Sequence, residues 1–164
     1  MRMTQLLAVL AALSLPAHAQ HAHGEGKLEV VIDKGDIAID LELPLDAAVG
    51  FERAPKNERE KAALATAEKV LGDAALFVPT PAANCKAQAP RVVMPAFGAK
   101  HGDDGHADID ASYVYRCADP AALKSVETGI FKSFKRLYRL EAQRVGPGGQ
   151  GAMRLTPKNP VLTW

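Results

Sequence analysis

Two short histidine clusters contain the residue types that suit metal binding. His21 and His23 form the first cluster, and His101 and His106 form the second, which also holds three carboxylates at Asp103, Asp104 and Asp108. Neutral imidazole is the commonest side-chain ligand for zinc, copper and nickel, and an aspartate can add an oxygen ligand. The sequence therefore favours the binding of a divalent metal ion, with zinc expected and copper or nickel as alternatives.

The spacing within each cluster decides how its ligands would meet. In an extended chain, His21 and His23 lie on the same face and would chelate one ion. Gly102 and Gly105 allow the loop at 99–108 to fold back, so that its two histidines converge. Zinc usually has four ligands, and neither cluster supplies four strong ligands alone.

Three arrangements with metal and one without it remain open. The aspartates and water complete the loop site, or the N-terminal cluster folds onto the loop, or each histidine pair binds weakly. We favour a site centred on the loop, with the histidine-containing arm at 20–26 as an auxiliary source of ligands. The alternative is a solvated surface loop whose histidines are incidental.

The first 19 residues have the features of a secretory signal peptide. Arg2 supplies the positive start, Leu6–Leu15 is a short apolar run, and Ala17-His18-Ala19 offers a small-x-small cleavage site. Cleavage is therefore expected after Ala19. No later apolar run has the roughly 20 residues needed to cross a bilayer, so the exported product is not expected to be embedded in a membrane.

The expected processed chain is short and electrically balanced. The full chain has 20 Lys+Arg and 19 Asp+Glu, and Arg2 is the single charged residue at positions 1–19. Equal numbers of basic and acidic residues argue against nucleic-acid binding, which normally requires a basic excess. The remaining 145 residues suit one domain, expected at 27–164 after a flexible arm at 20–26.

Two cysteines, Cys85 and Cys117, are expected to form one disulfide in an exported protein. The closed loop would stabilise the fold by roughly 3–4 kcal/mol in the chain-entropy model. The second histidine cluster lies inside this loop, so the bond is expected to hold the base of a metal-binding loop. A pair of zinc thiolates is the alternative.

Alternating apolar residues predict strands on both sides of a helix. They indicate a hairpin over Lys27–Leu43, a short strand within Arg91–Phe97 and a longer strand over Ala107–Cys117. Asn57 followed by Glu60 resembles a capping box, which would begin a helix that ends near residue 71.

A second helix is predicted from Asp119-Pro120 to about Leu137. Its apolar stripe would comprise Leu123, Val126, Ile130, Phe134 and Leu137. Strands at about 138–142, 153–155 and 161–164 would follow. This order predicts an α+β fold in which a largely antiparallel sheet packs with two main helices and contains one disulfide.

Short segments spread over nearly the whole processed chain resemble one known family. They are His21–Gly24, Leu28–Val30, Gly50–Pro55, Ala83–Cys85, the loop at 101–108, Tyr113–Cys117 and Ile130–Phe134. In this order and spacing they resemble the ZrgA family of periplasmic zinc-uptake proteins of Gram-negative bacteria. The chain departs from the family at Arg53, where histidine is frequent, and in having only two loop histidines.

The resemblance implies a periplasmic zinc-binding accessory protein that captures zinc or hands it over. A periplasmic zinc-binding protein or a zinc ABC importer would be its partner. The alternatives are a general buffer for copper, nickel and zinc, or a disulfide-stabilised envelope interaction domain. A metallohydrolase is disfavoured because the sequence lacks His-Glu-x-x-His or a comparable motif, so no enzymatic activity is expected. Glu52 is interpreted as a surface or capping residue, with a distant ligand or base as the alternative.

Overall fold

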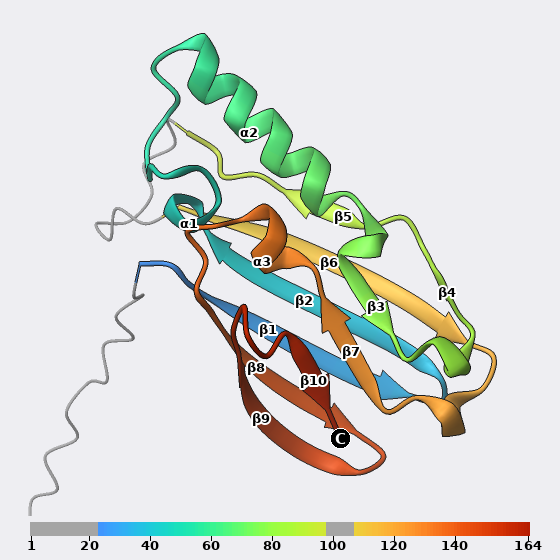
Figure 1. Ribbon diagram of the computed structural model, residues 1–164. Coiled ribbons are helices and arrows are strands. Elements are labelled where there is room, and N and C mark those ends of the chain that lie inside the picture. The colour runs from blue at the N-terminus through green and yellow to red at the C-terminus, as the bar shows by residue number, and fades with distance from the viewer. Residues whose placement is uncertain (1–22, 98–106) are drawn as a thin grey trace, which may run out of the picture.

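The computed structural model describes residues 23–97 and 107–164, and its main feature is a curved seven-stranded sheet (Figure 1). Its strand order is β4-β6-β2-β1-β8-β9, with β5 also paired to β6. The strands are β1 (Glu25–Asp33), β2 (Asp36–Pro44), β4 (Cys85–Ala87), β5 (Arg91–Val93), β6 (Asp108–Cys117), β8 (Arg139–Gly146) and β9 (Gly149–Leu155). All pairs are antiparallel except β1 with β8, which confirms the expected sheet type.

The predicted first hairpin is present and forms the centre of this sheet. Its register pairs Lys27 with Glu42 and Asp33 with Asp36 around a turn at Lys34 and Gly35. Alternate residues of β1 and β2 are buried, as the period-two pattern predicts. Because β2 runs back along β1, the start of β1 and the end of β2 lie at the same end of the sheet.

Strand β6 carries the predicted disulfide at its C-terminal end. Cys117 lies directly opposite Cys85 of β4, and their sulfur atoms are bonded at 2.05 Å. Asp108 begins β6 at the other end, about 30 Å away at 3.3 Å per residue. The expectation that the disulfide holds the base of the loop at 99–108 is therefore wrong, because the loop leads into the opposite end of the strand.

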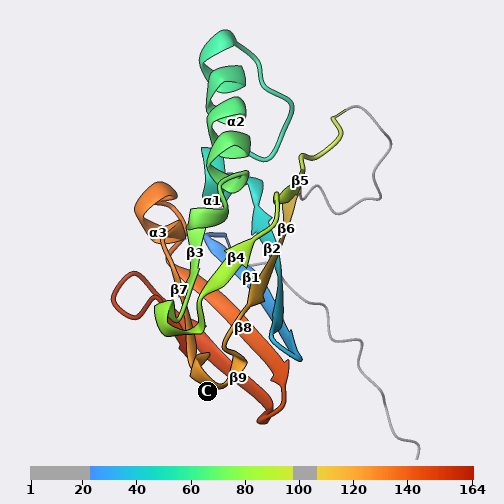
Figure 2. The same cartoon turned by 90° about the vertical axis from the view of Figure 1, so that its right-hand side faces the viewer.

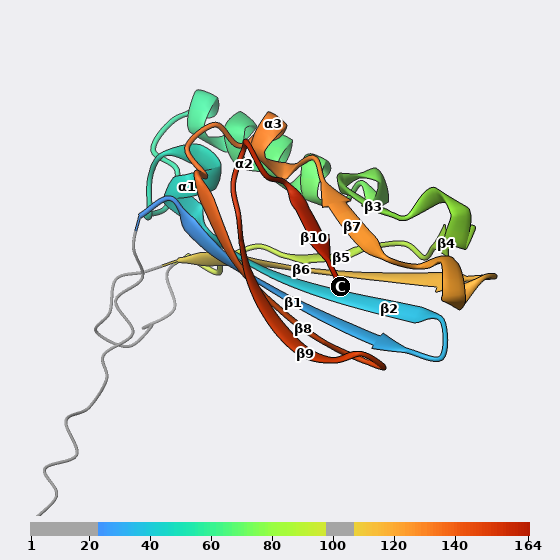
Figure 3. The same ribbon diagram turned by 60° about the horizontal axis from the view of Figure 1, so that its bottom comes forward.

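One face of the large sheet is covered by a second layer (Figures 2 and 3). This layer contains a three-stranded sheet in the order β10-β7-β3 and the helices that the structure describes. Its elements are α1 (Leu45–Val49), α2 (Glu58–Leu71), β3 (Phe77–Pro79), β7 (Ser125–Thr128), α3 (Ile130–Ser133) and β10 (Val161–Thr163), with short 3-10 turns at Ala74–Leu76, Pro81–Ala83 and Pro120–Ala122.

Helix α2 begins as the capping pattern predicts. The Asn57 side chain accepts a hydrogen bond from the Glu60 backbone N–H at 2.9 Å. The C-terminal end of α2 is fixed to the sheet, because the Tyr113 hydroxyl donates to the Leu71 carbonyl at 2.7 Å. Tyr113 is buried, and this burial raises its pKa.

The second predicted helix is wrong as an element, although its apolar residues are buried as expected. Residues 119–137 form a 3-10 turn, then β7, then the single-turn helix α3. In β7, Val126 and Thr128 are buried while Glu127 is exposed, which is a period of two. Pairing with β3 and β10 outweighs helix propensity here, and Gly129 separates β7 from α3.

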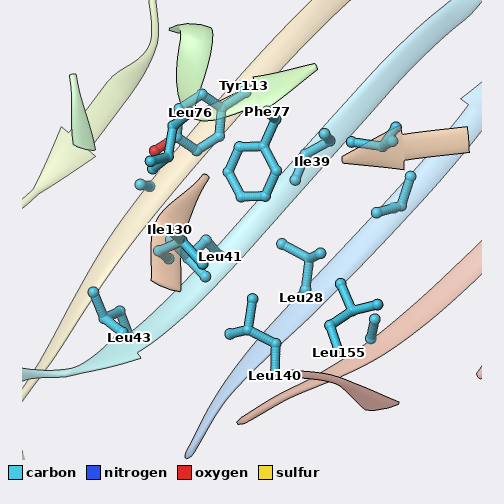
Figure 4. Close-up of a cluster of buried hydrophobic side chains, with 14 of the residues drawn as sticks. Leu28, Ile39, Leu41, Leu43, Leu76, Phe77, Tyr113, Ile130, Leu140 and Leu155 are labelled. Carbon is cyan, nitrogen blue, oxygen red and sulfur yellow. The ribbon is translucent and has the colours of Figure 1, made fainter. Parts of the chain in front are cut away.

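A single hydrophobic core fills the space between the two layers (Figure 4). Leu28, Ile39 and Leu41 reach it from the hairpin, and Phe77 and Ile130 reach it from the second layer. The Phe77 and Tyr113 rings pack edge to face with centroids 4.8 Å apart. This core holds the central hairpin rigidly against α1, which follows it in the chain.

Candidate metal centre

Three possible metal ligands meet at the end of the hairpin where β1 begins and β2 ends. His23 lies two residues before β1, Asp46 lies in α1, and Glu52 follows α1 by three residues. One ligand atom from each residue lies within 4.8 Å of the other two. No other group of three histidine, cysteine or carboxylate side chains is this close within residues 23–97 and 107–164.

The distances fit the coordination of a zinc ion. His23 Nδ1 lies 3.0 Å from Asp46 Oδ2 and 3.7 Å from Glu52 Oε1. Tetrahedral zinc with bonds of about 2.0–2.1 Å keeps its ligand atoms about 3.3 Å apart. The two observed separations lie on either side of this value, and the shorter one is a hydrogen bond between His23 and Asp46.

Asp46 also has one carboxylate oxygen whose hydrogen bonding is incomplete. Its Oδ1 atom is buried and has no hydrogen-bond partner in the part of the chain that the structure describes. A buried polar atom without a partner costs about 1–3 kcal/mol and is rare in folded proteins. A cation bound by the Asp46 carboxylate would satisfy its charge, and two carboxylates with one imidazole form a donor set that zinc accepts.

Asp46 is held in place by the short helix that contains it. Leu45 and Ala47, on either side of it, are almost completely buried in the core. The Gly50 backbone N–H donates to the Asp46 carbonyl at 2.8 Å and ends the helix. The Asp46 carboxylate is therefore attached to a rigid backbone while its Oδ2 atom faces His23.

Glu52 is held by the structured segment that follows it. Arg53 donates two hydrogen bonds to Glu60, at 2.7 and 2.9 Å, and lies 5.1 Å from the centre of the Phe51 ring. The hydrogen bonds from Arg53, and then from the Lys56 backbone, lower the pKa of Glu60 to about 2. Arg53, at which the family frequently has histidine, thus binds Glu60 of α2 in this chain.

His23 is held through the start of β1. Glu25 forms an ion pair with Arg139 and accepts a hydrogen bond from the Tyr138 hydroxyl at 3.0 Å. Partial burial of Glu25 opposes ionisation, but the hydrogen bonds from Arg139 and Tyr138 outweigh it and lower its pKa. The hydrogen bond to Glu25 raises the pKa of Tyr138. These contacts fix the backbone two residues after His23.

The structure describes two of the seven ligands that the sequence suggests. His23 belongs to the cluster, whereas Asp108 begins β6 and is not part of the close group of three. His21, His101, Asp103, Asp104 and His106 lie outside the described residues. Of the predicted arm at 20–26, Glu25 and Gly26 belong to β1.

The last residues of the loop at 99–108 lie next to the segment that contains Asp46. The Ala107 carbonyl accepts a hydrogen bond from the Leu45 backbone N–H at 2.8 Å, and Asp108 pairs with Pro44. Leu45 is the immediate neighbour of Asp46. The C-terminal end of the loop therefore contacts the residue that precedes Asp46 in the chain.

Sequence reasoning did not single out Asp46, and it preferred a surface or capping role for Glu52 over that of a distant ligand or base. The hairpin itself offered the missing signal, because residues just before its first strand and just after its second must be neighbours. His23 stands in the first of these positions, and Asp46 and Glu52 follow the second. No motif in the sequence joins the three residues, which are separated by both strands.

Within the described residues, no helix is long and apolar enough to cross a membrane. A search of curated proteins found no match. Residues 20–164 match the family model of the ZrgA family zinc uptake protein, so the match contains every element described above and all three residues of the cluster. With the geometry suited to zinc and a match over most of its length, the chain belongs to the ZrgA family of zinc uptake proteins.

Proposed function

We propose that this protein is a periplasmic zinc-binding accessory protein that captures Zn²⁺ and hands it to the uptake machinery. The observation that carries the proposal is the convergence of His23, Asp46 and Glu52 within 4.8 Å of one another. The family match supports zinc as the ion. Three protein ligands leave the fourth zinc position open to water or to a further histidine, as suits an ion that must later be released.

The histidines outside the described residues would supply the additional ligands. His21 is two residues from His23, and the loop that contains His101 and His106 ends beside Leu45. Asp103, Asp104 and Asp108 are the oxygen donors of the same loop. In this proposal the cluster is the fixed part of the site, and the loop and the arm complete it.

Export to the periplasm is supported by three features. Residues 1–19 have the pattern of a signal peptide, and the family match begins at residue 20, which would be the first residue after cleavage. The Cys85–Cys117 disulfide is typical of an oxidising compartment. A periplasmic zinc-binding protein or a zinc ABC importer would then receive the ion.

Zinc titration by calorimetry, with elemental analysis, tests the proposal on the chain at 20–164. His23→Ala, Asp46→Asn and Glu52→Gln each remove one ligand and should raise the zinc Kd by at least about tenfold, or about 1.4 kcal/mol. The paired change His101→Ala with His106→Ala should lower affinity or stoichiometry if the loop contributes ligands.

Asp33→Asn is the matched control, because Asp33 is an exposed carboxylate at the opposite end of β1. It should bind zinc as the wild type does. Unchanged zinc affinity in His23→Ala, Asp46→Asn and Glu52→Gln would contradict the assignment of this cluster as the zinc site.

A further inference from the structure

Two glycines next to the candidate ligands are both contacted by one short segment, residues 136–138, which we name the positioning segment. Gly24 follows His23, and Gly50 lies between Asp46 and Glu52. Their φ angles are +74° and +88°, a region that side-chain-bearing residues rarely adopt. The chain therefore turns sharply beside each part of the cluster, and the positioning segment packs at both turns.

The contact at Gly24 involves the backbone and the Tyr138 ring. The Tyr138 backbone N–H donates to the Gly24 carbonyl at 3.0 Å. A Cβ atom at Gly24 would lie 2.5 Å from Tyr138 Cε1 and 2.7 Å from the Arg136 carbonyl oxygen. The ring and the carbonyl thus lie directly against the Gly24 α-carbon and fix the direction in which the chain leaves His23.

The contact at Gly50 involves the Arg136 side chain. A Cβ atom at this position would lie 2.8 Å from Arg136 Nε and 3.0 Å from Arg136 Cζ. The guanidinium group therefore packs against the backbone that joins Asp46 to Glu52. One residue contacts both turns, with its carbonyl at Gly24 and its side chain at Gly50.

Exposure argues against a role in the core for these side chains. Tyr138 is 50% exposed, and Arg136 is also exposed. Leu137, between them, is buried and anchors the segment to the core. An exposed aromatic ring and an exposed guanidinium add little apolar burial. Beside the hydrogen bond from the Tyr138 hydroxyl to Glu25, their packing on the two turns is the contact that distinguishes them from other surface residues.

We propose that Arg136 and Tyr138 are positioning residues of the metal centre, setting the separation between His23 and the Asp46–Glu52 pair. This inference rests on the proposed function. Tyr138 acts on His23 through Gly24, and Arg136 acts on the two carboxylates through Gly50. Groups that orient metal ligands typically change metal affinity by about 10- to 100-fold when they are removed.

The test compares zinc Kd values and Co²⁺ absorption spectra for the disulfide-bonded chain at 20–164. Tyr138→Ala and Arg136→Ala should each raise the zinc Kd by about 10- to 100-fold and alter the intensity of the cobalt ligand-field bands. Tyr138→Phe keeps the ring on Gly24 and loses only the exposed hydroxyl's bond to Glu25, which stays paired with Arg139. It should retain an affinity within about threefold of the wild type, well below that range. Arg116→Ala and Val145→Ala are controls at exposed positions in the large sheet.

A double-mutant cycle separates positioning from general stability. The effect of Tyr138→Ala should disappear in a His23→Ala background, because the ring acts through that ligand.

If Tyr138→Ala and Arg136→Ala both bind zinc as tightly as the wild type while His23→Ala does not, the positioning role is wrong and the proposed function stands. If His23→Ala itself binds normally, the proposed zinc site fails first. Thermal unfolding shows whether each variant is folded. If Arg136→Ala is misfolded, the zinc Kd of Arg136→Gln, a milder substitution at the same exposed position, replaces it in the test.

Discussion

Glu60 is a half-buried residue that organises the segment after Glu52. Its carboxylate accepts hydrogen bonds from both terminal nitrogens of Arg53 and from the Lys56 backbone N–H. These bonds lower its pKa from 4.5 to about 2. The depressed pKa in the folded state means that ionised Glu60 stabilises the fold at neutral pH.

The pH dependence of this contribution has a definite sign. Because the folded pKa lies below the unfolded value, the stabilisation is complete above about pH 4.5 and is lost as the pH falls through about 2. Glu60→Gln should therefore reduce the fall in unfolding free energy across this window, as measured by urea denaturation at several pH values. Glu58→Gln, in the same helical turn, should retain the wild-type profile. Parallel profiles for Glu60→Gln and the wild type would disprove this role.

At the residue scale, sequence reasoning proposed the histidine of the cluster as a ligand, considered Glu52 only as the less favoured alternative, and did not single out Asp46. His23 stands out because it belongs to one of two short histidine clusters and histidine is often a metal ligand. Asp46 and Glu52 are two of many acidic residues, and nothing in their spacing relates them to His23. Only the pairing of β1 with β2 brings them close to His23, so this proximity could not be deduced from local pattern alone.

At the scale of elements, the long period-two patterns predicted β1, β2 and β6 with small errors at their ends. The second helix failed because its apolar residues are compatible with either periodicity. Leu123, Val126, Ile130, Phe134 and Leu137 are all buried, but they reach the core from a strand, a turn and a single helical turn. The three-stranded sheet that decides this region is built from strands of three or four residues, which are too short for a clear pattern.

The disulfide is an element whose stability role should separate from metal binding. Replacing both cysteines by serine removes a cross-link over 32 residues and should lower the unfolding free energy by about 3–4 kcal/mol. Zinc affinity should remain at the wild-type value, because the bond lies about 30 Å along β6 from the end beside Asp46. Denaturant unfolding and calorimetry measure the two effects separately. A parallel loss of zinc affinity would show that the two ends of β6 are coupled.

At the scale of the whole molecule, a ligand that binds only the folded chain must stabilise it. The three residues of the cluster converge only when β1, β2 and α1 are packed on the core. Free zinc at 100 times its Kd should therefore raise the unfolding free energy by about 2.7 kcal/mol. Differential scanning calorimetry with and without zinc measures this shift, which EDTA should reverse. His23→Ala should show little shift at the same zinc concentration, and an equal shift in that variant would place the ion elsewhere.

The parallel pairing of β1 with β8 also determines when, during synthesis, the start of β1 can be fixed in place. Glu25 and the Tyr138 hydroxyl that binds it are 113 positions apart, and Gly24 depends on the same distant partner. Contacts this remote form only after most of the polypeptide has been made. A chain that is made N-terminus first presents His23 early, but at that stage it lacks β8, the strand whose start would hold this residue opposite Asp46. If the proposed cluster is the zinc site, incomplete chains should therefore bind zinc poorly, and zinc binding should appear only with the finished fold.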